Sequence, residues 1–349
     1  MVSRTEAILR RERMKITLPQ LIELFAATKR IEGCTPKTVN WYSCLLTHFA
    51  NYIGNGEPTK LKDVSVNDAR AFIASLQNRL VRYKDHPKHP EKEGGLSPYT
   101  IHGYVRALKA FSSWLHEEGF AACNIFARLK KPKLPKPMIK ILSDEEMSAI
   151  ISAMNPNSFL GARQYTIVLV LLDTGIRASE LCGLTLDNTD IDNGTIKVMG
   201  KGRKERIVPF ASGTKKALLR YVTTWRPEPA YEGIDNLFLS IRGTPLSYNG
   251  LRHVITRIGH RAGIPRLHPH LFRHTFAVKY LINGGDVMTL RLILGHATLE
   301  VTRTYVHLAE AHVQVQHHRF SPVDRILARG RLRRRRKGGR RSIGRGFIG

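Results

Sequence analysis

The sequence predicts a mainly helical protein of two domains, with a small β-sheet in the second domain. Three observations support this fold class. Apolar residues recur at helical spacing along most of the chain, and one short region alternates apolar and polar residues as strands do. A stretch rich in proline and lysine separates the two parts. With 349 residues, 42% of them hydrophobic, the chain is long enough to bury two cores.

Four amphipathic helices are predicted in the first third of the chain. Each starts after a residue typical of a helix N-cap, and two of these residues precede a proline. The capping residues are Thr17, Thr35, Ser65 and Ser97. The polar, proline-punctuated segment from Arg82 to Gly95 is predicted to be a loop between the third and fourth helices. We therefore expect a helical domain over residues 1–130.

Residues 131–140 are predicted to form an extended linker. Lys130 to Lys140 contains three prolines and five lysines, which disfavours a helix. The lysines fit a solvated linker and a segment that follows DNA phosphates equally well. A second domain is expected over residues 141–318, followed by a basic tail over residues 319–349.

The second domain is predicted to be helical around one β-hairpin. Ser143 followed by three acids marks a helix start. A nearly wholly apolar helix from Ala162 to Asp173 is expected to be buried. A turn signal at Asp192-Asn193-Gly194 precedes two alternating strands, Thr195 to Met199 and Glu205 to Phe210. Helical patterns then return from Lys215 to Val313.

The chain is strongly basic. It has 56 Lys and Arg against 28 Asp and Glu, a net charge of +28, and a pI near 10.4. From Arg325 onward there are 11 basic residues and no acid, so 45 basic and 28 acidic residues leave +17 on the preceding part. Such a field attracts polyanions. Composition therefore favours a nucleic acid as partner and disfavours most enzymes of small metabolites.

Other protein classes are disfavoured by what the sequence lacks. No apolar run approaches the roughly 18 residues that a membrane helix needs. The charged N-terminus does not resemble a secretory signal, so we expect a cytoplasmic protein without a membrane partner. The four cysteines form no CxxC pair, which disfavours a disulfide framework or a zinc ribbon.

Several basic and aromatic residues in the second domain are candidates for chemistry. They are Arg177 after a glycine turn, Lys201 in a basic hairpin tip, His270 and Arg273 three apart on one helical face, His296 at an expected helix start, and Tyr305 nine residues later. Each alone has an ordinary structural explanation, such as a surface salt bridge or core packing. His268, His270 and His274 also suggest metal ligation, but no Glu or Cys cluster completes a ligand shell, so no metal is expected.

As a set, these residues resemble the motif of the tyrosine recombinases, also called the phage-integrase or Xer-like family. The segments that carry the resemblance are TGIRASELCGL, GKGRKERIVPF, HPHLFRHTFA and LGHATLEVTRTYVH. The similarity covers about residues 15–315. The helical N-terminal part resembles the family's core-binding (SAM-like) domain, and the second domain resembles its mixed α/β catalytic domain. The resemblance implies a site-specific recombinase or integrase that cuts and rejoins DNA.

The resemblance also implies roles for single residues. Tyr305 would attack the scissile phosphate and form a 3′-phosphotyrosyl bond. Arg177 and Arg273 would neutralise charge in the transition state, and His296 would donate a further hydrogen bond. These groups would stand in for a metal, so neither Mg²⁺ nor ATP nor any other cofactor is expected.

Two proton transfers complete the implied chemistry. Lys201 would protonate the leaving 5′-oxygen, and His270 would accept the proton of the tyrosine. Arg203 and Lys204 share the hairpin tip and are alternatives to Lys201. Glu180 either orients a neighbouring basic group or forms a solvated ion pair.

The remaining expectations concern partners and alternatives. The resemblance implies a homotetramer on paired recombination sites in double-stranded DNA, because the last helix of relatives, here Glu310 to His318, docks into a neighbouring subunit. Arg331 to Arg341 is either a non-specific DNA anchor or an unconstrained terminus. The extra loop and the tail favour integration of a mobile element slightly over resolution of chromosome dimers. A type IB topoisomerase and a catalytically silent DNA-binding protein remain alternatives.

Overall fold

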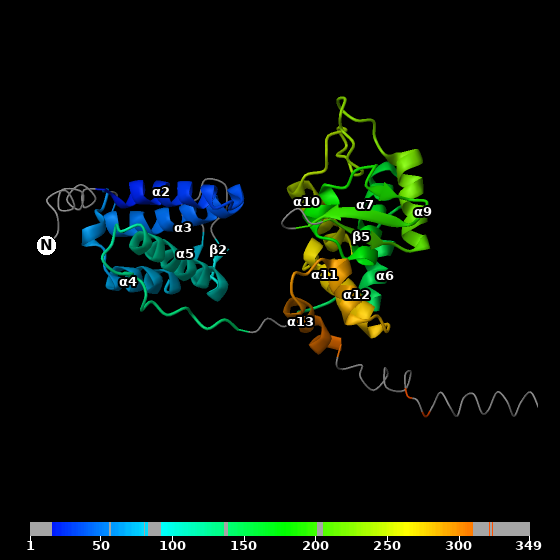
Figure 1. Ribbon diagram of the computed structural model, residues 1–349. Helices are drawn as coiled ribbons and strands as arrows, with labels where there is room; N and C mark the ends of the chain where they lie inside the picture. The colour runs from blue at the N-terminus through cyan, green and yellow to red at the C-terminus, as the bar shows by residue number, and fades with distance from the viewer. Residues whose placement is uncertain are drawn as a thin grey trace, which may run out of the picture. The chain divides into compact units, whose positions relative to one another are not determined.

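The chain divides into two compact units, Met1–Pro137 and Met138–Gly349 (Figure 1). The computed structural model describes residues 16–55, 57–79, 81–82, 92–135, 139–200 and 205–309, together with residues 321 and 323. These residues are mainly helical, and each unit has a hydrophobic core of its own. The predicted fold class, mainly α with a small sheet in the second unit, is confirmed.

In the described part of the N-terminal unit, four helices form a bundle, as predicted. They are α2 (Leu18–Ile31), α3 (Pro36–Gly54), α4 (Val66–Gln77) and α5 (Pro98–Glu117), with a 3₁₀ turn, η1 (Leu61–Asp63), before α4. The predicted caps are present: the hydroxyls of Thr35 and Ser97 each accept a backbone N–H three residues on. Ser65 and Asp68 cap each other's backbone in a capping box.

Aromatic side chains fill the core of this unit. Phe25 of α2 contacts Phe111 and Trp114 of α5 edge-on, with ring centroids 5.4 Å apart in both pairs. The α5 helix therefore holds the bundle together through its apolar face.

The segments predicted to be a loop and a linker differ in how regular they are. At the ends of the polar segment, β1 (Val81–Arg82) and β2 (Lys92–Glu93) pair antiparallel, whereas residues 83–91 lie outside the described residues. Residues 131–135 and 139–140 of the expected linker have no regular secondary structure. Apart from residues 321 and 323, the expected tail lies outside the described residues, as does the helix expected from Glu310 to His318.

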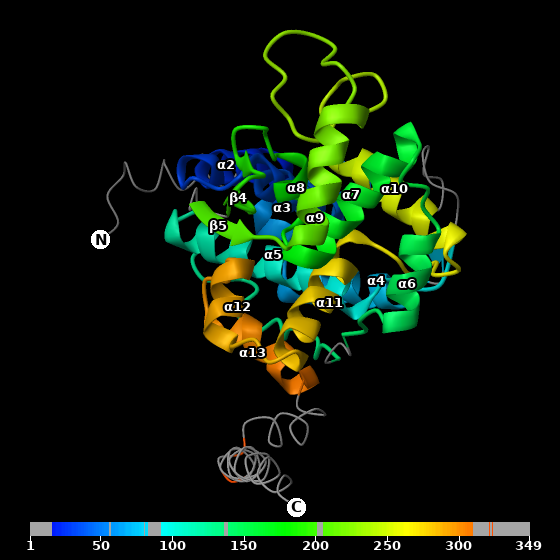
Figure 2. The same cartoon turned by 90° about the vertical axis from the view of Figure 1, so that its right-hand side faces the viewer.

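The C-terminal unit packs helices around a small sheet. Its helices are α6 (Asp144–Ser152), α7 (Phe159–Thr174), α8 (Ala178–Cys182), α9 (Ser212–Arg220) continuing into the π-helical η2 (Tyr221–Trp225), α10 (Tyr248–Arg261), α11 (Pro269–Ile282), α12 (Val287–Leu294) and α13 (Leu299–Ala309). Figure 2 shows α11, α12 and α13 grouped below the strands of the sheet. The apolar helix α7 is buried along most of its length, as predicted, and begins three residues earlier than expected because Ser158 caps it.

The sheet has three strands where the sequence predicted a hairpin of two. The expected pair is present as β4 (Thr195–Met199) and β5 (Glu205–Pro209). A third strand, β3 (Thr189–Asp190), pairs antiparallel with β4. The Asp190 side chain accepts hydrogen bonds from Asn193 across the turn between them. Two polar residues carry no alternation of hydrophobicity, so the pattern could not reveal β3.

One predicted helix start is wrong. The sequence places His296 at the beginning of a helix, but it lies in the connection between α12 and α13, and α13 begins at Leu299. Gly295 adopts a left-handed φ of 62° and ends α12, as a C-terminal glycine does. His296 is therefore held by the end of a helix and not by its first turn.

Candidate active site

The turn after α7 places the first arginine of the site. Gly175 has a φ of 61°, and a Cβ there would lie 2.3 Å from Phe276 Cδ1, so glycine is required. Arg177 follows as the N-cap of α8, and its backbone N–H donates to Glu180 Oε2 at 2.8 Å. Arg177 Nη1 donates to Oε1 of the same carboxylate at 2.8 Å. One carboxylate thus fixes both the backbone and the guanidinium of Arg177.

A second arginine, which the sequence analysis did not single out, binds the same carboxylate. Arg206 of β5 donates from Nη1 to Glu180 Oε1 at 2.9 Å and from Nη2 to Oε2 at 2.8 Å. The side chains of Arg206 and Glu180 are 12% and 4% exposed, so this bidentate pair is largely shielded from water. Burial raises the pKa of Glu180, but hydrogen bonds from Arg206 and Arg177 outweigh burial and hold the pKa below its usual value.

A third arginine comes from α11. Arg273 is 4% exposed and donates from Nη1 to the carbonyl of Gly175 at 2.8 Å. Burial lowers the pKa of Arg273 to about 10, with a further contribution from the charge of Arg177. Arg273 therefore remains charged at neutral pH.

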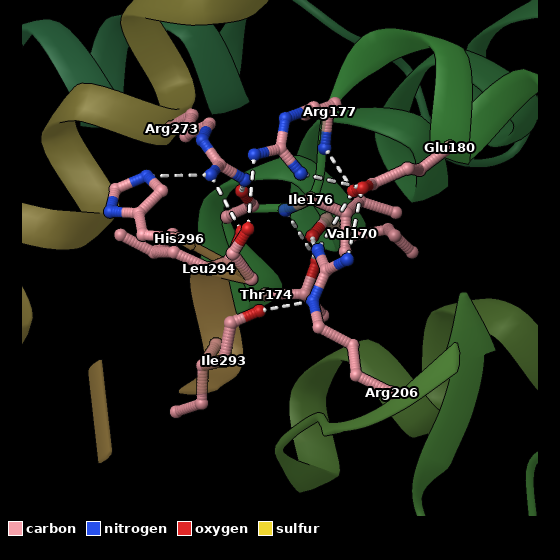
Figure 3. Close-up of polar contacts among 12 residues, drawn as sticks. Val170, Thr174, Ile176, Arg177, Glu180, Arg206, Arg273, Ile293, Leu294 and His296 are labelled. Carbon is pink, nitrogen blue, oxygen red and sulfur yellow. Dashed lines mark hydrogen bonds and ion pairs between the residues drawn. The ribbon is translucent and has the colours of Figure 1, made fainter. Parts of the chain in front are cut away.

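The three arginines meet at the C-terminal end of α12 (Figure 3). Each donates to one of three successive backbone carbonyls. The pairs are Arg206 Nε to Ile293 O at 2.7 Å, Arg273 Nη2 to Leu294 O at 2.7 Å and Arg177 Nη2 to Gly295 O at 3.3 Å. The last carbonyls of a helix have no partner within it, so these guanidinium groups satisfy them.

His296 is held between the arginines and α13. Arg273 Nη2 lies 2.9 Å from His296 Nε2. A guanidinium can only donate, so Nε2 accepts and the proton of the neutral ring is on Nδ1. Nδ1 lies 2.9 Å from the hydroxyl oxygen of Thr302, a fully buried residue of α13, and donates a hydrogen bond to it. Burial, together with Arg273 and Arg177, lowers the pKa of His296 to about 4.

Tyr305 lies against the same histidine. Its ring stacks on that of His296, with centroids 6.1 Å apart and planes 15° apart, and the residue is 5% exposed. Its hydroxyl lies 2.9 Å from Nδ1 of His274 on α11. Burial lowers the pKa of His274 to about 4, so the ring is neutral and can accept a hydrogen bond. Burial also raises the pKa of Tyr305, against the opposing effect of Arg273 and Arg177, so the hydroxyl keeps its proton.

Five of the six predicted site residues are described, and the structure brings them together. They are Arg177, His270, Arg273, His296 and Tyr305. His270 lies one turn before His274 on α11, with ring centroids 6.3 Å apart, and burial and Arg273 lower its pKa. Lys201 lies outside the described residues, as do Arg203 and Lys204. The pairing of Met199 with Glu205 nevertheless shows that residues 200–204 join β4 to β5 beside Arg206.

The site carries more positive than negative charge. Within the described part of the chain, Arg177 and Arg206 share one carboxylate, that of Glu180, and Arg273 has no carboxylate partner, so three positive charges face one negative charge. Their other partners are neutral carbonyls and a neutral imidazole. A largely buried cluster of this kind suits an anionic group such as a phosphodiester.

The described residues contain no group of three or more His, Cys, Asp or Glu side chains that could hold a metal ion. Among the described helices, none is long and apolar enough to cross a membrane. The four cysteines are all described, and all are free thiols.

The sequence relatives identify the family. A sequence model of the phage integrase family matches residues 140–312. The tyrosine recombinase XerC of Oceanobacillus iheyensis is 32% identical over 306 residues, which are 86% of this chain and 95% of that protein. The tyrosine recombinase XerD of Staphylococcus aureus is 32% identical over 230 residues, 65% of this chain and 78% of that protein. The chain therefore belongs to the phage integrase family, whose members are tyrosine recombinases.

Solved structures share the two-domain fold. The XerH site-specific recombinase bound to a palindromic difH substrate matches with a TM-score of 0.65 and 22% identity, over 83% of this chain and 82% of that one. The Tn1549 transposon integrase in complex with transposon right end DNA matches with a TM-score of 0.66 and 20% identity, over 88% of this chain and 100% of that one. These similarities concern the fold, and they confirm the architecture that the resemblance implied.

The lowered histidine pKa values predict a loss of stability in acid. Well above pH 6.5, His274 and His296 are neutral in the folded and the unfolded chain, so they give no pH dependence there. As the pH falls from about 6.5 to about 4, the two rings bind protons in the unfolded chain but stay neutral in the folded one. The free energy of unfolding therefore falls by on the order of 1–3 kcal/mol per ring. Hydrogen exchange of α11 and α13, corrected for intrinsic rates, should lose protection over this range.

Two variants make this measurement specific. His274→Gln should reduce the pH dependence of protection, because it removes one of the titrating rings. His260→Gln, at an exposed position on α10, should leave it unchanged. Protection that is independent of pH, or an equal slope in wild type and His274→Gln, would contradict the assignment.

Proposed function

We propose that the chain is a site-specific DNA recombinase that cuts and rejoins strands through a 3′-phosphotyrosyl intermediate, with no metal or ATP. The position of Tyr305 carries this proposal. Its ring stacks on His296, and His296 contacts Arg273, so the hydroxyl lies next to the uncompensated positive charge. A buried tyrosine that only filled space in the core would not need a histidine and positively charged arginines beside it.

The proposed step exchanges one phosphate ester for another. The Tyr305 oxygen forms a bond to phosphorus and the bond from phosphorus to the 5′-oxygen breaks. The product is a 3′-phosphotyrosyl bond and a free 5′-hydroxyl. Attack by another 5′-hydroxyl reverses the step and rejoins the strand, which conserves the energy of the ester.

Arg177 and Arg273 are proposed to bind the non-bridging oxygens of the phosphate, with His296 as a further donor. Each guanidinium has five N–H groups, and the contacts to carbonyls and to Glu180 leave some of them available. Groups held in place before the substrate arrives stabilise the transition state without having to reorganise.

Lys201 is proposed as the acid that protonates the 5′-oxygen. Support comes from its place between two glycines in the connection from β4 to β5, next to the strand that carries Arg206. His270 is proposed to accept the proton of Tyr305. The contact between His274 and the hydroxyl makes His274 the second candidate for that role.

DNA binding is proposed to involve both units. Residues 1–130 would form the core-binding domain, residues 131–140 a basic strap, and residues 141–318 the catalytic domain. The basic tail, residues 319–349, would add non-specific phosphate contacts. The net charge of +17 before Arg325 supports DNA contacts well beyond the tail.

A homotetramer on paired sites is proposed as the active assembly. Met288 and Leu292 are 53% and 63% exposed one turn apart on α12, and Val301 on α13 is 51% exposed. Apolar side chains on two contacting helices support a surface that another subunit covers. Sedimentation of the protein with DNA that carries two sites measures the number of subunits.

Integration of a mobile element and resolution of chromosome dimers are the two candidate biological roles, and both would use this chemistry. The extra loop and the basic tail support integration of a mobile element, while the curated relatives are named XerC and XerD. The DNA sequences that the protein joins separate the two roles. Action on DNA in the cytoplasm is part of the proposal. Relaxation of supercoils without strand exchange would instead support a type IB topoisomerase.

The nucleophile is tested by a covalent-adduct assay. The protein is incubated in EDTA with nicked suicide duplexes made from the DNA that flanks its gene, and complexes that resist SDS are isolated. Tyr305→Phe should abolish the adduct and leave DNA affinity within about 2-fold, because only the attacking oxygen is lost. Tyr280→Phe, a tyrosine on α11 that packs on Phe276, is the matched control and should form adduct as wild type does.

The junctions of the adducts give the recombination site and so its genomic context. An adduct at the wild-type rate in Tyr305→Phe would overturn the assignment of the nucleophile. If neither wild type nor variant forms an adduct on these duplexes or on a random-sequence library, the proposed strand cleavage is refuted.

The role of Lys201 is tested with a modified leaving group. Lys201→Ala should slow cleavage of normal DNA by about 10²-fold or more, because the 5′-oxygen leaves without a proton. A substrate with a 5′-bridging sulfur should restore the rate, since a thiolate leaves without an acid. The variants Arg203→Ala and Lys204→Ala are controls. A defect in Lys201→Ala that sulfur does not rescue would assign the proton to another group.

The proton acceptor is tested by comparing the two histidines of α11. We expect His270→Gln to slow adduct formation by about 10²-fold or more and His274→Gln to slow it much less. The reason is that an arriving phosphate draws the Tyr305 hydroxyl towards the arginines and away from His274. Single-turnover rates from pH 5.5 to 9 measure both effects. The opposite ranking would assign the acceptor role to His274.

A further inference from the structure

We infer that Arg206 is a positioning residue of the cleavage site, which ties β5 to Arg177 and to the connection that carries His296. The inference rests on the proposed function. The proposed mechanism gives Arg206 no role. Its guanidinium nevertheless forms hydrogen bonds to Glu180 and to the end of α12, two parts of the protein that hold proposed site residues. Three sets of contacts support the assignment.

The first contact is with Glu180. Arg206 holds both oxygens of this carboxylate in a fork, and the same two oxygens hold the backbone N–H and Nη1 of Arg177. A carboxylate that binds only one partner can rotate about its side-chain torsions. With the fork in place, Glu180 has one orientation, and the guanidinium of Arg177 is fixed through it.

The second contact is with the end of α12. Arg206 Nε donates to Ile293 O at 2.7 Å, three residues before His296. A Cβ built on Gly295 would lie 2.9 to 3.0 Å from Nη1, Cζ and Nε of Arg206. The guanidinium of Arg206 therefore packs directly against the backbone of Gly295. This contact limits where the connection that carries His296 can lie.

The third contact is the strand itself. Arg206 pairs with Val198 in the ladder of β4 and β5, two residues after the connection that contains Lys201 ends. Its bonds to Glu180 and Ile293 therefore fix the start of β5 against α8 and α12. A single guanidinium thus contacts both the carboxylate that holds Arg177 and the end of the helix that precedes His296 (Figure 3).

Arg206→Lys is the variant that tests this position. It keeps the positive charge beside Glu180 but cannot form the fork and the bond to Ile293 together. In single-turnover cleavage of the suicide duplex at saturating DNA, we expect the rate to fall about 10- to 100-fold. The dissociation constant for the duplex should change less than about 3-fold, because Arg206 is not proposed to touch DNA.

Glu205→Gln is the matched control. Glu205 precedes Arg206 on the same strand, and its ion pair with Lys197 is solvent-exposed, both side chains being 49% exposed. This variant should cleave within about 2-fold of wild type. A circular dichroism melt of each variant identifies any loss of folding, and Glu180→Gln, which removes the shared carboxylate at constant size, should reproduce the defect if Arg206→Lys does not fold.

A second background separates positioning from general damage. When Arg177 is already lysine, adding Arg206→Lys should slow cleavage by a smaller factor than it does in wild type, because one of the groups that Arg206 positions has been replaced. An equal loss in both backgrounds, or a wild-type rate for folded Arg206→Lys, would overturn the inference. The failure of the proposed function looks different, since wild type itself would then form no adduct that depends on Tyr305.

Discussion

The C-terminal turn of α12 is the feature on which the catalytic unit depends. Three arginines, from α11, β5 and the start of α8, donate to the carbonyls of its last two residues and of Gly295, its C-cap. Buried guanidinium groups need acceptors, and the carbonyls at the end of a helix need donors, so each satisfies the other. The negative end of the helix dipole favours the same arrangement. His296 directly follows Gly295, so these contacts at the end of α12 also fix its position.

The choice of acceptors also sets the charge of the site. Had each arginine been paired with a carboxylate, the cluster would be neutral and would not attract a phosphate. Backbone carbonyls satisfy the N–H groups without cancelling their charge. Glu180 is the exception, and it serves two arginines at once. One carboxylate therefore orients Arg177 and Arg206, while the remaining positive charge is available to attract an anionic ligand. Burial strengthens both effects, because screening by water is weak there.

Local signals predicted most of the fold, and the family resemblance supplied the candidate site residues. Caps such as Thr35, Ser65 and Ser97 mark helix starts because they act within one turn. The contacts that build the site are not local: Arg206 meets Ile293 across 87 positions and Arg177 meets Gly295 across 118. Arg206 lies inside a segment that carries the family resemblance, yet nothing in its spacing indicates a partner. His274 was visible only as one imidazole among three, and Thr302 only as a polar residue near Tyr305.

Two of the proposed reacting groups, Tyr305 and His296, have partners within the protein. Tyr305 is buried with its hydroxyl on His274, and the Nε2 atom of His296 is occupied by Arg273. A phosphate that binds Arg273 competes for the guanidinium that now contacts His296. Its negative charge also opposes the effect of the arginines on the ring, so it raises the pKa of His296 from about 4. Binding of the phosphate thus frees His296 and makes it a better donor in one event.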